Sequence, residues 1–96
     1  MTPSLPSQGT VLLVEDYPPG MMVGALMIEH LGYAVETAAS GLQAIEKVRA
    51  AATPFMAILM DVQMQGGMGG IEATKAIREL EQQKGYSSPI IAVTAH

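Results

Sequence analysis

With 96 residues, 49% of them apolar, the chain can build one domain around a hydrophobic core and no more. Its formal net charge is −4, and it has only five Lys and Arg residues. Both features disfavour nucleic acid or an anionic membrane as a direct partner. The absence of cysteine excludes disulfides, thiol nucleophiles and Cys-ligated metals.

The first ten residues are rich in Pro, Ser and Gly, and we predict a flexible leader over residues 1–10. They show neither the charged segment nor the apolar segment of a signal peptide. No apolar run approaches the roughly 20 residues that are needed to cross a bilayer. We therefore expect a soluble, cytoplasmic protein.

The first half of the chain predicts two strands, each followed by a helix. Residues 11–14 form a continuous apolar run, which is typical of a strand buried on both faces of a parallel sheet. Two prolines then open a helix whose apolar residues recur at helical spacing over residues 21–31, and Gly32 ends it. Residues 33–38 read as an edge strand of mixed polarity, and Ser40 as the N-cap of a helix running to about Ala51.

The second half repeats the alternation. An apolar strand over residues 55–60 is followed by a glycine-rich loop over residues 65–70, a helix from Ile71 to Lys84 and a fourth apolar strand over residues 90–93. Strands that alternate with helices are joined by right-handed crossovers. The expected fold class is therefore α/β, with a doubly wound parallel sheet.

Polar residues follow three of these strands at their carboxyl ends. Glu15 and Asp16 follow the first strand, Asp61 the third and Thr94 the fourth. If the first and third strands are neighbours, three carboxylates converge at the edge where such sheets bind ligands. Converging carboxylates need a counter-cation, and oxygen ligands favour Mg²⁺, which suits phosphoryl transfer to a carboxylate.

Each of these residues also has a simpler interpretation. An acidic residue directly after a strand is often a helix N-cap or a solvated turn residue, and this holds for Glu15, Asp16 and Asp61 taken one at a time. A threonine such as Thr94 is uninformative alone. The joint placement of the residues on strand ends favours a site.

Five segments resemble successive blocks of response-regulator receiver domains, above all those of hybrid sensor kinases: VLLVEDYPPGMMV, LGYAVETAASGLQAI, ILMDVQM, GIEATKAIREL and PIIAVTAH. The resemblance covers residues 11–96, with the blocks in the family's order. It implies a flavodoxin-like (CheY-like) fold and a role in two-component phosphorelay signalling.

By this resemblance Asp61 is the phosphoacceptor and Thr94 the switch hydroxyl. Asp16 would bind Mg²⁺ directly, Glu15 through water, Asp61 with its carboxylate and Gln63 through its backbone carbonyl. The donor would be a histidine kinase or a histidine phosphotransfer protein. The resemblance implies no enzymatic activity other than Mg²⁺-dependent self-phosphorylation of Asp61.

The sequence also departs from the family pattern. The family has five strands and five helices, whereas residues 11–96 match only about four strands and three helices, so we expect a receiver domain lacking its last helix-strand-helix part. The family's conserved lysine belongs to that part, and Lys84 is expected at the opposite end of the sheet. The loop after Asp61 carries Gln65 and Gly69 where the family usually has proline and an acid.

These departures leave other functions open. The chain could be a degenerate, truncated receiver that acts as an interaction module independent of phosphate, and its exposed fourth strand predicts a homo-oligomer. A phosphatase with an aspartate nucleophile is a further alternative, which Gln63 disfavours because such enzymes usually carry a second acid at that place.

Overall fold

The computed structural model describes residues 9–64 and 68–93, and within them four parallel strands alternate with three helices. The elements are β1 (Thr10–Val14), α1 (Pro18–His30), β2 (Ala34–Ala38), α2 (Gly41–Ala50), β3 (Ala57–Asp61), α3 (Gly70–Lys84) and β4 (Ile90–Val93). The strand order is β2-β1-β3-β4. The predicted α/β class, the parallel sheet and the alternation of elements are confirmed.

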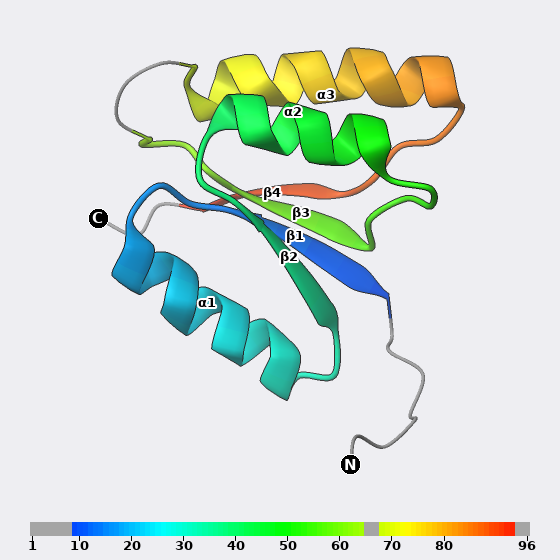
Figure 1. The fold of residues 1–96 in the computed structure, drawn as a ribbon. Helices are drawn as coiled ribbons and strands as arrows, with labels where there is room; N and C mark the ends of the chain where they lie inside the picture. Colours follow the sequence, from blue (N-terminus) through cyan, green and yellow to red (C-terminus); the bar gives the residue numbers. More distant parts are fainter. Residues whose placement is uncertain (1–8, 65–67, 94–96) are drawn as a thin grey trace.

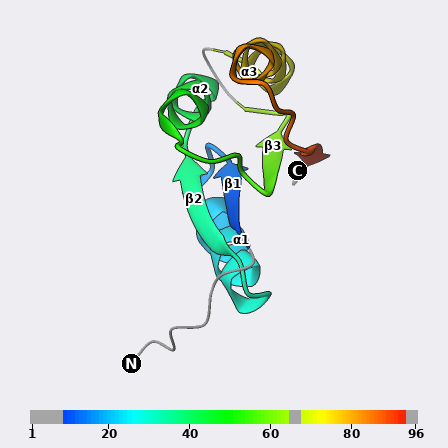
Figure 2. The same cartoon turned by 90° about the vertical axis from the view of Figure 1, so that its right-hand side faces the viewer.

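The helices form two layers around the sheet (Figures 1 and 2). Helix α1 packs on one face, over β1 and β2, while α2 and α3 lie side by side on the other. The alternation of side chains along the strands divides the core accordingly: Leu12 and Ile58 face α2 and α3, whereas Leu13 and Leu59 face α1. The sheet therefore buries residues on both faces, as continuously apolar strands predict.

Local signals fix most helix ends. Ser40 Oγ accepts a hydrogen bond from Gln43 N at 3.1 Å, and Gln43 Oε1 accepts one from Ala39 N at 2.8 Å, so both residues cap α2. Gly32 has a φ of 98° directly after α1, which is the conformation that glycine tolerates at a helix end. The predicted N-cap and the predicted stop are both observed.

The third strand is displaced from its predicted position by one to two residues. We predicted residues 55–60, whereas β3 runs from Ala57 to Asp61, because its pairing with β1 begins at Ala57 and its pairing with β4 extends to Asp61. The shift includes Asp61 in the strand itself. Its backbone is thereby paired with Val93 of β4.

Strand β4 lies at an edge of the described sheet. It pairs with β3 alone, in the register Asp61↔Val93 and Leu59↔Ile91. The Ile91 side chain is 51% exposed although the strand is apolar throughout. Within the described ranges, no helix has both the length and the apolar character that a membrane crossing requires.

Candidate functional site

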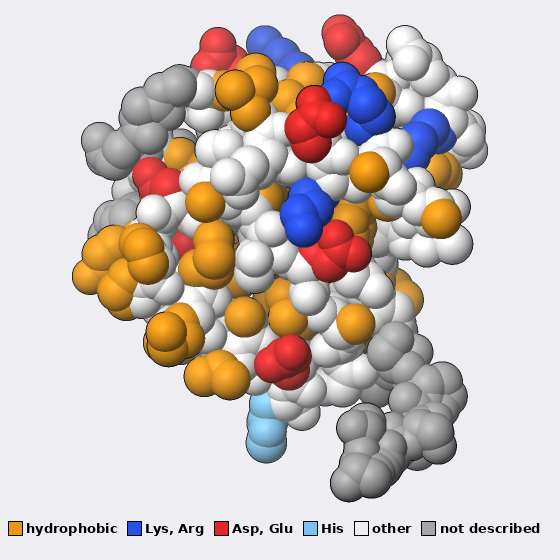
Figure 3. All heavy atoms as spheres, viewed as in Figure 1, with side chains coloured by type: hydrophobic (Ala, Val, Ile, Leu, Met, Phe, Trp, Pro, Cys, Tyr) orange, Lys and Arg blue, Asp and Glu red, His pale blue; other side chains and the backbone are white. Residues whose placement is uncertain are grey.

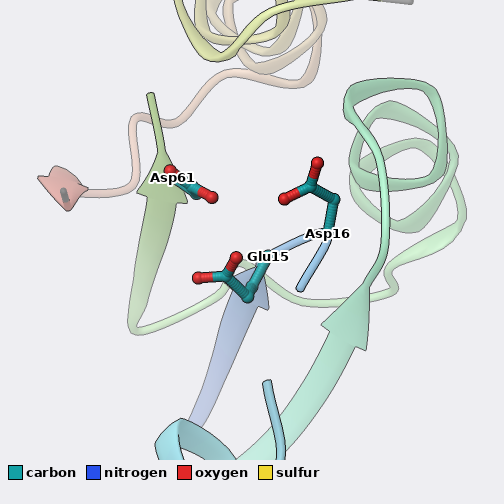
Figure 4. A group of neighbouring side chains, drawn as sticks. All are labelled: Glu15, Asp16 and Asp61. Carbon is teal, nitrogen blue, oxygen red and sulfur yellow. The ribbon is translucent and has the colours of Figure 1, made fainter. Parts of the chain in front are cut away.

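Three carboxylates meet at the carboxyl ends of β1 and β3. The parallel register pairs Val14 with Met60, so the residues that follow each, Glu15 and Asp61, stand side by side. Asp16 follows on the loop that leads into α1. One carboxylate oxygen from each of Glu15, Asp16 and Asp61 lies within 4.8 Å of the others, and Figure 4 shows the three side chains around one shared space.

The two strand-end acids are buried and held by their own turns. Glu15 is 5% exposed and Asp61 is 1% exposed, while Asp16 is half-buried. Glu15 Oε2 accepts a hydrogen bond from Tyr17 N at 3.0 Å, and Asp61 Oδ1 accepts one from Gln63 N at 2.8 Å. These backbone donors lie two residues after each acid, so the turns orient the carboxylates before any ligand binds.

Burial raises the pKa of Glu15 above its ordinary value of 4.5. The hydrogen bond from Tyr17 N lowers this pKa and so opposes burial, whereas a hydrogen bond with Asp61 and the charges of Asp61 and Asp16 raise it further. A proton therefore relieves part of the repulsion in the cluster. A cation bound among the carboxylates would relieve the same repulsion.

The donor set fits a hard divalent cation. It consists only of carboxylate oxygens, within 4.8 Å of one another, so that one ion can contact all three residues. Gln63 lies in the turn that Asp61 anchors, which is compatible with the predicted contribution of its backbone carbonyl. The roles of Glu15, Asp16, Asp61 and Gln63 as ligands stay predictions.

Gly70 supports the site in a way that sequence reasoning missed. A Cβ built on Gly70 would lie 2.6 Å from the Asp61 carbonyl oxygen and 2.9 Å from Val62 Cα. The first turn of α3 therefore rests against the backbone of the phosphoacceptor candidate, and a side chain would push the two apart. The only signal in the sequence was the position of this glycine, last in a glycine-rich run.

Other predicted features lie away from the carboxylates or outside the described residues. Lys84 Nζ donates to the carbonyls of Val48, Arg49 and Ala51 at the end of α2, far from the carboxyl ends of the strands, as predicted. Thr94 lies outside the described residues. Residues 65–67 of the loop after Asp61, among them Gln65, lie outside them as well.

The fold and the site together define a doubly wound α/β domain that gathers buried carboxylates at the rim of its sheet. Residues 11–96 match the response regulator receiver domain family, and the chain belongs to that family. It is therefore a receiver domain of two-component signalling, as the resemblance implied.

The curated relatives include large sensor proteins and histidine kinases. The chain is 42% identical over 87 residues to the signal transduction histidine-protein kinase BarA of Shigella flexneri and 41% identical over 87 residues to the sensor protein GacS of Pseudomonas syringae. The matches cover 91% and 90% of this chain but 9% of each relative. The chain thus spans about a tenth of the length of these proteins.

Solved structures of receiver domains have the same fold. The receiver domain of the Arabidopsis thaliana histidine kinase CKI1, complexed with Mg²⁺ and BeF₃⁻, is 32% identical with a TM-score of 0.84, over 94% of this chain and 68% of that one. The receiver domain of the Pseudomonas aeruginosa sensor kinase PA1611 is 38% identical with a TM-score of 0.79, over 92% and 68% of the two chains. That structure has a magnesium ion coordinated in its active site cleft.

Proposed function

We propose that Asp61 accepts a phosphoryl group from a phosphohistidine donor, with Mg²⁺ bound among Glu15, Asp16 and Asp61. One observation carries the proposal: the three carboxylates converge within 4.8 Å at the carboxyl ends of β1 and β3. Two of them are buried, so that their mutual repulsion is poorly screened and favours a bound cation.

Each residue has a defined part in this reaction. An oxygen of Asp61 forms a bond to phosphorus while the N–P bond of the donor breaks, and the bonding electrons leave with the imidazole. The Gln63 N–H donates to Asp61 Oδ1 and holds the carboxylate in one orientation. Asp16 would contact the metal directly, Glu15 through water, and Gln63 through its carbonyl. Mg²⁺, when bound, neutralises charge on the phosphoryl oxygens.

The proposal keeps the remaining roles that the family resemblance implied. Thr94 would donate its hydroxyl to the phosphoryl group as the switch residue. The partner would be a histidine kinase or a histidine phosphotransfer protein, which the kinase relatives support. The location that we propose is the cytoplasm. A division into a leader and a receiver domain over residues 11–96 belongs to the same proposal, although Thr10, which we predicted as part of the leader, already lies in β1. We also propose a self-phosphorylation of Asp61 that needs only a small phosphodonor.

The test is phosphorylation by acetyl phosphate with Mg²⁺, followed by intact-mass measurement. We expect the chain to gain the mass of one phosphoryl group, and we expect Asp61→Asn to gain none, because the amide cannot attack phosphorus. Removal of Mg²⁺ by a chelator should also abolish the gain.

A matched control is Glu79→Gln, which removes one exposed acid from α3 and changes the net charge by the same amount. This variant should be phosphorylated as the unsubstituted chain is. An equal mass gain in Asp61→Asn, or no gain in the unsubstituted chain with Mg²⁺ present, would contradict the proposal.

A further inference from the structure

Strand β2 leaves an open edge on the side of the sheet opposite β4. It pairs with β1 alone among the described strands, in the register Thr10↔Ala34 to Val14↔Ala38. Figure 2 shows β2 as the last strand on its side of the sheet. Its outer backbone groups therefore have no neighbouring strand within residues 9–64 and 68–93. An edge of this kind can accept a further strand.

The pairing with β1 identifies the backbone groups at the open edge. Ala34 N donates a hydrogen bond to Gly9 O at 3.0 Å, so Ala34 directs its backbone groups toward β1. Successive residues of a strand direct their N–H and C=O groups to opposite sides. Val35 and Thr37 therefore direct theirs to the open edge. An incoming strand finds two donors and two acceptors there, at the ordinary spacing of a parallel or antiparallel ladder.

The side chains of β2 also alternate between the two faces of the sheet. Val35 packs in the apolar cluster under α1, whereas Glu36 lies on the other face, with Oε1 3.6 Å from Lys47 Nζ of α2. A charged residue on an edge strand usually opposes pairing with another chain. Because Lys47 offsets the charge of Glu36, this opposition is weaker here than at an edge with an unpaired glutamate.

A groove of about 640 Å³ lies between the β2 edge and α2. Its lining is mainly apolar, with Leu42 and Ala50 on α2, Ala52 after the helix and Glu36 at the strand. The side chain of Leu42 is 62% exposed. Figure 3 shows hydrophobic side chains beside charged ones over α2 and β2. Because side chains alternate along a strand, every second side chain of an added strand would point toward this groove.

The charges that line the groove favour a basic ligand. Glu36 and Glu46 both line it, and their side chains are 47% and 69% exposed. Lys47 is the one basic residue among the described residues that line it. The groove thus carries more negative than positive charge, on a chain whose formal net charge is −4. A Lys or Arg beside the apolar side chain of a ligand is complementary to this arrangement.

We propose that β2 binds an extended segment of a partner protein as an additional strand, with one apolar side chain of that segment in the groove beside Leu42. A Lys or Arg two positions away in the segment lies near Glu36 or Glu46. The open groups of Val35 and Thr37 select an extended segment and not a helix, because a helix has already paired its backbone groups internally. This binding goes beyond the phosphorylation proposed above and uses neither Mg²⁺ nor Asp61.

A synthetic peptide of sequence Thr-Lys-Thr-Leu-Thr-Lys-Thr tests the proposal on the full chain. Its Leu and Lys side chains share one face of a strand. With saturating peptide, the amides of Val35 and Thr37 should exchange with solvent about ten-fold or more slowly in NMR, because they donate to the peptide. Ala92 is the internal reference at the open edge of β4, and the exchange of its amide should not change.

Modified peptides test the backbone pairing and the charge separately. One peptide carries N-methyl groups on its Leu and Lys residues, and a second carries them on its inner Thr residues. Only one of these two sets of N–H groups can face β2, so one peptide should bind at least ten-fold more weakly and the other as the parent does. A third peptide with Glu in place of both Lys should bind about ten-fold more weakly at low salt.

Variants of the chain supply the second arm. Leu42→Ser should weaken binding of the parent peptide about ten-fold, whereas Ile71→Ser removes a side chain of similar exposure, 67%, from α3 and should leave binding unchanged. Thr37→Pro should abolish binding, because proline has no N–H and its ring occupies the open edge. Thr37→Ala keeps the N–H and should bind as the unsubstituted chain does. Circular dichroism checks that each variant keeps its fold.

Several results would overturn the proposal. They are the absence of peptide binding, an equal effect of the two N-methylated peptides, and slower exchange at Ala92 in place of Val35 and Thr37. Equal losses in the Leu42 and Ile71 variants would remove the role of the groove. Self-association that Thr37→Pro abolishes, without peptide binding, would assign the edge to a second copy of the chain. Asp61→Asn should bind the peptide as the unsubstituted chain does, so this proposal and the phosphorylation fail independently.

Discussion

Glu15 is the residue at which a proton would compete with a bound cation. Its pKa is raised chiefly by burial, and an acid whose pKa is higher in the folded state than in the unfolded state binds a proton more tightly when folded. Its contribution to the stability of the metal-free protein is therefore fully present below the ordinary pKa of 4.5. That contribution is lost as the pH rises through the folded-state pKa.

Metal binding should show the opposite pH dependence. We expect the affinity for Mg²⁺ to increase as the pH rises through the raised pKa of Glu15, because the ion needs the ionised carboxylate. Isothermal titration with MgCl₂ over a pH series measures this. Glu15→Gln should lower the affinity and remove the part of the pH dependence that lies above 4.5; an unchanged profile in this variant would contradict the assignment to Glu15.

Gly70 is a second residue whose substitution tests the site, because an added Cβ would meet the backbone of Asp61. Gly70→Ala should destabilise the fold by about 1–3 kcal/mol, because its Cβ would overlap the Asp61 carbonyl oxygen and the backbone must move. It should also weaken Mg²⁺ binding, since the strand end that carries Asp61 shifts with the carbonyl. Urea unfolding and metal titration measure the two effects.

Gly69→Ala is the matched control, because a Cβ there would find its nearest neighbour, Glu72 Oε1, 3.7 Å away. We expect this neighbouring substitution to cost no more than about 1 kcal/mol and to leave metal affinity unchanged. Equal effects at both positions would show that α3 does not rest on Asp61 in the way described.

At the scale of elements, a side chain of α3 binds the carbonyl groups at the C-terminal end of α2. Lys84 Nζ lies 2.9 Å from Val48 O, 3.1 Å from Arg49 O and 3.0 Å from Ala51 O, all carbonyls at or just after the last turn of α2. A cation at this end of a helix is also favoured by the helix dipole. The ammonium thus ties the two helices that cover one face of the sheet.

Lys84→Met should therefore lower the free energy of unfolding by about 1 kcal/mol, and the loss should shrink at high salt. Lys75→Met is a suitable control, because Lys75 is also exposed on α3 and has no hydrogen bond or ion pair among the described residues. Urea titrations of both variants at low and high salt give the comparison. Equal losses would mean that the helix-end contact contributes nothing.

At the scale of the whole molecule, the sheet has an apolar edge. Strand β4 pairs only with β3 in the described part of the chain, and its outer edge offers unpaired backbone groups to another strand. We propose a homo-oligomer formed through this edge. In sedimentation velocity the chain should form a dimer or larger species at micromolar concentration.

Ile91→Lys should shift this equilibrium toward monomer, because a charge on an edge strand opposes pairing. The control, Leu42→Lys on α2, adds the same charge at another exposed apolar side chain and should leave the oligomeric state unchanged. A compact monomer for the unsubstituted chain at these concentrations would contradict the proposal.

The sequence alone determined the local structure, because the signals for it lie within a few residues of one another. Ser40 and Gln43 cap a helix that follows them directly, Gly32 ends one, and the apolar runs of β1 and β3 require cover on both faces. The family resemblance added the predicted roles of Asp61 and its neighbours, again from short blocks. Both ends of β3 were misplaced, since pairing with β1 and β4 decides where this strand starts and stops.

Only the tertiary structure decided which distant residues meet. That Glu15 and Asp61 stand side by side follows from the placement of β3 next to β1, a pairing across more than forty residues that no local pattern encodes. The contact of Gly70 with the Asp61 backbone has the same origin. A sequence specifies the chemistry of each side chain, but electrostatic and steric contacts depend on distance in space, which the packing of the sheet and its helices sets.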